Sequence, residues 1–164
     1  MLLSNNIVVF DKETKNSKWY ITNDDVMGGV SNSSIVIDNE GSAIFSGQVS
    51  LENNGGFSMV RLPVDISLNS NSSKIVLKIK GDSKKYQLRI KSKKRQRFWY
   101  VSTFQTSNKI QKIEIPLKDF YPSFRGYRLN YNNFSGNNIK EIAILIGNKK
   151  NENFNLKIEK ISIK

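Results

Sequence analysis

Short stretches in which hydrophobic and polar residues alternate dominate the chain. In residues 74–80, KIVLKIK, the side chains of Ile75, Leu77 and Ile79 share one parity, and lysines occupy most of the other. Residues 84–91, KKYQLRIK, repeat the pattern. Successive side chains of a β-strand point to opposite faces of the sheet, so this period of two predicts strands with one buried face.

The same alternation recurs along most of the sequence. The last such stretch changes parity between Ile158 and Ile161, which predicts a β-bulge or a bend near residues 159–160. Clusters of Asn, Gly, Asp and Ser separate the stretches, as expected for turns. The further stretches lie at 33–38, 42–50, 57–62, 98–105, 110–115, 139–146 and 154–163.

No long segment has the 3.6-residue period of a helix. The best helical candidate is a single turn at residues 116–120, with Pro116 at a suitable first position. Many short strands at regular spacing favour a β-sandwich or barrel and leave no room for parallel βαβ units. The length of 164 residues fits one domain, so we expect a single all-β domain over residues 1–164.

The composition narrows the chemistry that is open to the chain. It contains no cysteine and no histidine, which excludes disulfides, thiolate sites and the commonest general base and metal ligand. We therefore expect no enzyme activity, no cofactor and no metal site, although a carboxylate pair could still act as acid and base. The net charge of +12 favours nucleic acid, an anionic membrane or an acidic protein as partner.

The first residues, MLLSNNIVVF, lack a basic segment followed by the hydrophobic run of a signal peptide. No stretch approaches the roughly 18 apolar residues of a membrane span. We therefore expect a cytoplasmic location, which could extend to a peripheral position at the inner face of the membrane.

Two polar loops each contain a pair of glycines, NDDVMGG at residues 23–29 and ENNGG at residues 52–56. Glycine adopts positive φ without steric cost, and Asn and Asp tolerate it, so both loops are expected to turn sharply or to pack closely. Tight connection is the commoner role of such clusters. The alternative is a binding surface, whose candidate residues are Asp24, Asp25, Gly28, Gly29, Asn53, Asn54, Gly55 and Gly56.

The sequence in and around these loops resembles the complex I intermediate-associated protein 30 family. The similarity extends from about Phe10 to the last predicted strand, and Ser83 stands where members frequently have glycine. The segments that carry it are Trp19 followed by DDVMGGVS (24–31), FSGQVSLENNGGFSMVR (45–61), KGDSKKYQLRI (80–90) and IPLKDFYPSFRG (115–126).

The resemblance implies a galactose-binding-domain-like jelly-roll sandwich, in agreement with the strand pattern, and a bacterial stand-alone member of the family. It also implies a non-enzymatic, protein-binding role, because eukaryotic members assist assembly of respiratory NADH:ubiquinone oxidoreductase in a chaperone-like way. The expected partner is then a protein client, such as a respiratory-complex subunit or an assembly intermediate.

Other functions stay open beside this one. A jelly-roll carbohydrate-binding module would bind sugar on aromatic platforms, and nucleic acid or anionic lipid could bind a basic stretch. Nothing in the residue spacing selects a sugar. Aromatic residues available for a sugar site are Trp19, Tyr20, Trp99, Tyr127 and Tyr131.

We expect Asp24 or Asp25 to pair with Arg61, because buried charges are usually paired and a guanidinium binds a carboxylate with two hydrogen bonds. Adjacent side chains on a strand point apart, which argues against a catalytic pair of aspartates. Arg125, which precedes Gly126, is a second candidate for such a pair. In this hypothesis the two loops meet at one edge of the sandwich and Arg61 holds them together.

The densest charge cluster is KSKKRQR at residues 91–97, followed by Phe98, Trp99 and Tyr100. Basic and aromatic residues together can bind single-stranded nucleic acid or lipid headgroups. We favour a solvated hairpin tip, with Phe98 and Tyr100 on one face and Trp99 on the other. The candidate residues of this basic patch are Lys91, Lys93, Lys94, Arg95, Arg97 and Trp99.

Overall fold

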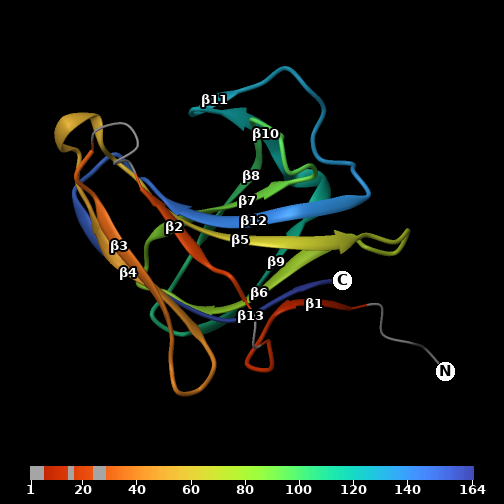
Figure 1. Ribbon diagram of the computed structural model, residues 1–164, viewed down its shortest axis with the longest axis horizontal. Helices are drawn as coiled ribbons and strands as arrows, with labels where there is room; N and C mark the ends of the chain where they lie inside the picture. The colour runs from red at the N-terminus through yellow and green to blue at the C-terminus, as the bar shows by residue number, and fades with distance from the viewer. Residues whose placement is uncertain (1–5, 15–16, 24–28) are drawn as a thin grey trace.

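A computed structural model describes residues 6–14, 17–23 and 29–164, apart from the side chain of residue 54. Its strands form two antiparallel sheets (Figure 1). The first sheet contains β1 (Ile7–Phe10), β3 (Asn32–Ile37), β4 (Ala43–Val49), β6 (Lys74–Lys80), β9 (Ile110–Pro116) and β13 (Glu152–Ile163). The second contains β2 (Tyr20–Asn23), β5 (Ser58–Ser67), β7 (Lys85–Lys91), β8 (Trp99–Gln105), β10 (Tyr121–Phe124), β11 (Tyr127–Arg128) and β12 (Asn138–Ile146).

The order of the strands shows that the chain crosses repeatedly between the sheets. The six-stranded sheet runs β3-β4-β13-β6-β9, with β1 paired to β13, and the seven-stranded sheet runs β11-β10-β8-β7-β12-β5-β2. The expected all-β jelly-roll sandwich is therefore confirmed. No helix in the described part of the chain has the length and apolar character needed to cross a membrane.

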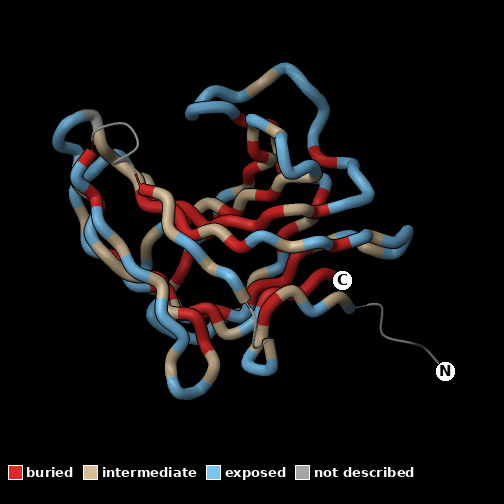
Figure 2. The backbone as a smooth tube through the Cα atoms, in the orientation of Figure 1, coloured by how far each residue is buried: buried red, intermediate tan, exposed pale blue. Residues whose placement is uncertain are grey.

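The main core lies between the two sheets, where the alternating hydrophobic residues meet. Ile75, Leu77 and Ile79 of β6 are fully buried, as are Leu88 and Ile90 of β7 on the facing sheet. Figure 2 shows buried backbone along the central strands and exposed backbone at the turns. The period of two thus predicted correctly which alternate side chains of these strands are buried, because each sheet has one face in the core.

Details at the strand ends follow the local sequence. The register of β13 against β6 shifts between Ile158 and Lys160, which confirms the expected bulge. The expected helical turn is the 3-10 segment η3 (Leu117–Asp119), which Pro116 directly precedes. The pattern missed β1, β2, β10 and β11, which have only two to four residues each and show too few alternations to be recognised.

Ser83, at the position where glycine is frequent in the resembled family, has a φ of 67°. A residue with a Cβ loses roughly 1–2 kcal/mol in the left-handed region, and replacement by glycine removes this cost. Part of that gain in stability is offset by the greater freedom of glycine in the unfolded chain. We therefore expect Ser83→Gly to raise the free energy of unfolding by about 0.5–1 kcal/mol. Urea denaturation measures it, with Ser34→Gly in strand β3 as a matched control that should lower stability. A lower stability of Ser83→Gly would contradict the prediction.

Candidate functional site

The seven-stranded sheet has a second face, turned away from the main core. Strand pairing sets side chains in rows across it, and one row runs Tyr121, Val101, Arg89, Ala143, Arg61 and Tyr20, each opposite the next. Residues two positions along a strand share a face, so Trp99, Lys91 and Glu141 lie in the neighbouring row on the same side. We call this surface the open face; its principal residues are Tyr20, Arg61, Arg89, Lys91, Trp99, Tyr121 and Glu141.

The floor of the open face is hydrophobic. Met59, Trp99, Val101, Ala143 and Leu145 form a cluster separate from the main core, and Phe57 and Tyr121 pack against it. Long polar side chains of the same sheet cover the floor. The guanidinium carbon of Arg61 lies 5.2 Å from the ring centre of Trp99, and Nζ of Lys91 lies 4.4 Å from it. Such distances are those of cation–π contacts.

Arg61, Glu141 and Tyr20 form a hydrogen-bonded group at one side of the open face. Nε and Nη2 of Arg61 donate to the two carboxylate oxygens of Glu141, each at 2.7 Å, and the Tyr20 hydroxyl donates to Oε2 at 2.8 Å. Glu141 is 8% exposed, so its charge is satisfied almost entirely by these partners. The group joins β2, β5 and β12 through side chains that lie as many as 121 residues apart in sequence.

These contacts change the pKa values of the group. Burial and the Glu141 carboxylate raise the pKa of Tyr20 to about 12. Burial opposes ionisation of Glu141, but the hydrogen bonds from Arg61 and Tyr20 hold its pKa below the ordinary 4.5. At neutral pH the hydroxyl of Tyr20 is therefore neutral and the carboxylate of Glu141 is ionised, so Glu141 acts here as a hydrogen-bond acceptor.

A cavity of about 410 Å³ adjoins this group. Tyr20 and Glu141 line one side, and Pro63, Asp65, Lys94 and Lys140 are among the residues that complete it. Nζ of Lys140 bonds the carboxylate of Asp65 at its rim. The open face therefore offers an aromatic and charged surface with a concave edge.

The double-glycine loops lie partly outside the described residues, which do not include Asp24, Asp25 and Gly28. Gly29 is buried, and Asn53 and Gly56 have φ values of 54° and 136°. The hydroxyl of Ser31 accepts from the backbone N–H of Ser50 at 2.8 Å. The described ends of the two loops are thus neighbours, with Asn53, Asn54, Gly55 and Gly56 in and after the 3-10 segment η2 (Glu52–Asn54).

Arg61 pairs with the carboxylate of Glu141. The expected pairing of Arg61 with Asp24 or Asp25 concerns residues outside the described part of the chain and stays a prediction. Arg61 lies within β5 on the open face, so its side chain points at β12 and β2 rather than into a loop. Arg125 is exposed, with a φ of 51°, in the β10–β11 turn. That turn is at the opposite edge of the sheet from β2, so the structure does not bring Arg125 to Arg61.

The basic patch divides between two environments. Lys93, Lys94, Arg95 and Arg97 are exposed in the β7–β8 turn, as expected for a solvated hairpin tip. Lys91 and Trp99 lie on the open face instead. The rings of Phe98 and Tyr100 contact each other at 5.2 Å on the other side of the strand, which confirms the predicted division of the three aromatic residues.

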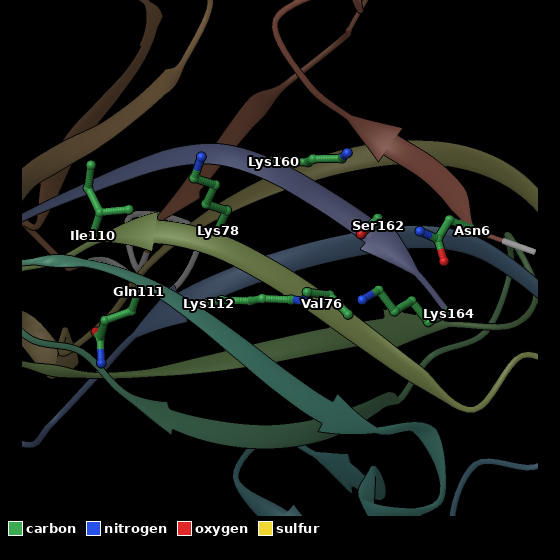
Figure 3. A pocket seen from close by; sticks show the side chains of 9 residues that line it. All are labelled: Asn6, Val76, Lys78, Ile110, Gln111, Lys112, Lys160, Ser162 and Lys164. Carbon is green, nitrogen blue, oxygen red and sulfur yellow. The ribbon is translucent and has the colours of Figure 1, made fainter. Parts of the chain in front are cut away.

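A larger basic surface covers the outer side of the six-stranded sheet. Here a cavity of about 430 Å³ is lined by residues that include Val76, Lys112, Lys160 and Lys164. In Figure 3 the side chains of Lys112 and Lys164 point toward each other over Val76, and the proximity of Lys112 lowers the pKa of Lys164. We call this surface the lysine face; its lysines are Lys74, Lys78, Lys80, Lys112, Lys157, Lys160 and Lys164.

The lysine face is less specific than the open face. Lys74, Lys78 and Lys157 each pair with a carboxylate, and Lys78, Lys80 and Lys160 are exposed to water. Exposed lysines lose little free energy of hydration, so they give weak evidence for a ligand. Within the described residues no group of three or more acidic side chains is arranged to hold a metal ion.

Sequence reasoning missed several residues of the open face, above all Glu141, Arg89 and Tyr121. A signal for Glu141 was present, because Glu141 and Lys140 are the two charged residues within the otherwise hydrophobic stretch 139–146. Arg89 occupies one of the alternate polar positions of the stretch 84–91, which predicted that its side chain points away from the core. Neither signal showed which strands would be neighbours, and the open face is built from side chains of neighbouring strands.

Comparisons with known proteins agree with this fold. Two structures of the family 11 carbohydrate-binding module from Clostridium thermocellum are each 20% identical. One, in complex with a β-1,3-1,4-mixed-linked tetrasaccharide, has a TM-score of 0.65 over 96% of this chain and 94% of that one. The other, from the cellulosomal cellulase Lic26A-Cel5E, has a TM-score of 0.67 over 99% of this chain and 95% of that one. A family 29 carbohydrate-binding module is 10% identical, with a TM-score of 0.60 over 97% and 87%.

At these identities the structural likeness shows the fold alone. A comparison with curated protein sequences gave no match. The sequence profile of complex I intermediate-associated protein 30, however, matches residues 8–158, nearly the whole chain. That match covers both sheets and every residue of the open face, and the chain therefore belongs to the complex I intermediate-associated protein 30 family.

Proposed function

We propose that this chain is a non-enzymatic protein-binding module, an assembly or chaperone-like factor, that contacts its client through the open face. The observation that carries the proposal is the hydrophobic floor of Trp99, Val101 and Leu145 on a sheet face that points away from the main core. Trp, Tyr and Arg dominate the energetics of protein interfaces, and all three residue types gather here.

Family membership supports a protein partner, because the family is named for an intermediate of complex I. The client would then be a subunit or an assembly intermediate of a respiratory complex. The net charge of +12 suits a position in the cytoplasm at the inner face of the membrane, where such a client is assembled.

The proposal is tested by affinity purification from detergent-solubilised native cells, read by mass spectrometry. Thr103 is exposed on the open face opposite Gln87, and Ser34 is exposed on the outer side of β3. Thr103→Arg adds bulk and charge to the open face, and Ser34→Arg makes a similar change elsewhere. We expect wild type and Ser34→Arg to enrich the same partners, and Thr103→Arg to lose at least about 90% of that enrichment, as for loss of about 1.4 kcal/mol.

Two results would contradict the proposal in different ways. If repeated purifications with wild type enrich no specific protein, the chain is not an assembly factor for a stable client. If Thr103→Arg retains the partners and is folded, the client binds elsewhere and the open face is not the contact surface.

Carbohydrate binding is a second candidate function. The observation in its favour is that Tyr20, Trp99 and Tyr121 lie on one sheet face, where aromatic rings can stack on sugar rings. The solved structures of similar fold include one with a bound tetrasaccharide. A glycan array with wild type and Thr103→Arg tests it: binding that wild type shows and Thr103→Arg loses would support a sugar site on the open face.

A further inference from the structure

The charges of the open face do not balance. Four cations lie on it, Arg61, Arg89, Lys91 and Arg128, and Glu141 is the carboxylate that the described residues place among them. Glu141 is bound to Arg61. Arg128 is exposed over the ring of Tyr121, at 4.7 Å from its centre. Among the described residues no carboxylate pairs with the half-buried Arg89, and the carboxylate nearest Lys91, that of Glu141 on the opposite strand, is already bound by Arg61.

Arg89 is the less well satisfied of the two. Its Nε and Nη2 both donate to one atom, Oε1 of Gln87, at 2.9 and 2.7 Å. A guanidinium has five N–H donors in a planar fork that fits a carboxylate, so this arrangement leaves donors for another acceptor. A buried cation is normally paired with a carboxylate, whereas Arg89 has a neutral amide as its hydrogen-bond partner.

The electrostatic cost appears in the pKa values. Burial lowers the pKa of Arg89 to about 10. Burial, followed by repulsion from Arg61, lowers the pKa of Lys91. The protein alone therefore disfavours the charged forms at this place, and an anion bound beside both side chains would reverse the effect.

The spacing of these cations indicates the shape of the anion. Arg89 and Lys91 are two residues apart on β7, which places them about 6.8 Å apart along the strand. Alternate residues of an extended peptide have the same spacing, so acidic residues at positions i and i+2 would face the two cations in register. Tyr121, from the row of Arg89, adds a partly exposed aromatic ring for the residues beside the acidic ones.

We infer that the open face recognises an extended acidic segment of a protein, with carboxylates at alternate positions bound by Arg89 and Lys91. The inference rests on the proposed function and names the chemical class of the contact. The polar groups here are predominantly cationic, which favours an anionic ligand over a neutral sugar. The lysine face is a weaker candidate for the same role, because its lysines are exposed.

Binding of a hexapeptide of alternating Glu and Thr, measured by isothermal titration calorimetry at low ionic strength, tests the inference. The same hexapeptide with Gln in place of Glu is the ligand control. The variants are Arg89→Met and Lys91→Met. Lys160→Met on the lysine face removes the same charge from an exposed site and is the protein control.

We expect wild type and Lys160→Met to bind the acidic peptide alike, and Arg89→Met and Lys91→Met to bind it about tenfold or more weakly, because hydrogen bonds to charged groups contribute at least that factor. The thermal unfolding midpoint of Arg89→Met should equal or exceed that of wild type, since a buried unpaired charge is removed. A residue that only stabilised the fold would show the opposite. Binding of the Gln peptide should be undetectable.

Several outcomes would overturn the inference without deciding the proposed function, which the affinity purification tests separately. Equal binding by wild type and both methionine variants would place the anion elsewhere. Absence of peptide binding, while affinity purification still shows partners lost by Thr103→Arg, would remove the acidic segment but keep the protein contact. Binding of hexagalacturonate, included as a further arm, in preference to the peptide would assign the cations to an acidic polysaccharide.

Discussion

Replacing Arg61 by alanine is expected to lower the free energy of unfolding by about 3 kcal/mol, the low end of the range for breaking a buried ion pair. The variant leaves the carboxylate of Glu141, which is 8% exposed, with the Tyr20 hydroxyl as its remaining side-chain donor. It also removes the cation from the rings of Tyr20 and Trp99, 5.0 and 5.2 Å from its guanidinium carbon. Urea denaturation gives the value directly.

The double variant Arg61→Met with Glu141→Leu is the matched control for this loss. Because both charges leave together, no buried ion is stranded, and we expect most of the stability to return. If the double variant is as unstable as the sum of the two single variants, the charges do not act as a pair and the prediction is wrong.

The pair of Arg61 and Glu141 should also make the free energy of unfolding fall as the pH is lowered. The pKa of Glu141 is lower in the folded chain than its ordinary 4.5. Its contribution is therefore complete above about pH 4.5 and is lost as the pH falls through the folded-state pKa. Acid should destabilise wild type more than the double variant, and parallel pH profiles of the two proteins would contradict this assignment.

Trp99→Ala is expected to lower the free energy of unfolding by about 3–5 kcal/mol, the usual cost of removing a large buried aromatic side chain. Trp99 is 8% exposed and forms the centre of the floor beneath Arg61 and Lys91. Its removal leaves a cavity that the long cations cannot fill without burying their charges. The measurement is urea denaturation of the variant and of wild type.

Tyr131→Ala is the matched aromatic control, because Tyr131 is 64% exposed. We expect its effect to stay below about 1 kcal/mol, as for most surface substitutions. If Trp99→Ala costs no more than Tyr131→Ala, the floor of the open face is not a packed cluster and its apolar area cannot anchor a client.

The fold could be predicted from the sequence because its signal is local. The alternation of Ile75, Leu77 and Ile79 requires a two-sided strand, and the parity change after Ile158 requires a bulge. The motifs of the family cover the same residues that build both sheets. The short strands β1, β2, β10 and β11 escaped because they form through pairing with a neighbour rather than through a pattern of their own.

The candidate site could be predicted only in part. Arg61, Lys91 and Trp99 were recognised as binding candidates, but each was assigned to a loop end or to a basic patch. Asp24 and Asp25, the carboxylates that the sequence suggested for Arg61, lie outside the described residues, so that pairing stays a prediction. Sequence reasoning did not indicate Glu141, which lies 80 residues from Arg61 and is brought to it by strand pairing between β5 and β12.

The amino-acid sequence was sufficient to predict an all-β sandwich, the buried side of each central strand and the family. The tertiary structure was needed to see which polar side chains share the open face, and therefore that Arg61 pairs with a carboxylate whereas Arg89, within the described residues, does not. The physical reason is that alternation is a property of one strand, whereas the order and register of strands are set by non-local hydrogen bonds and packing. Charge balance on a sheet depends on those neighbours.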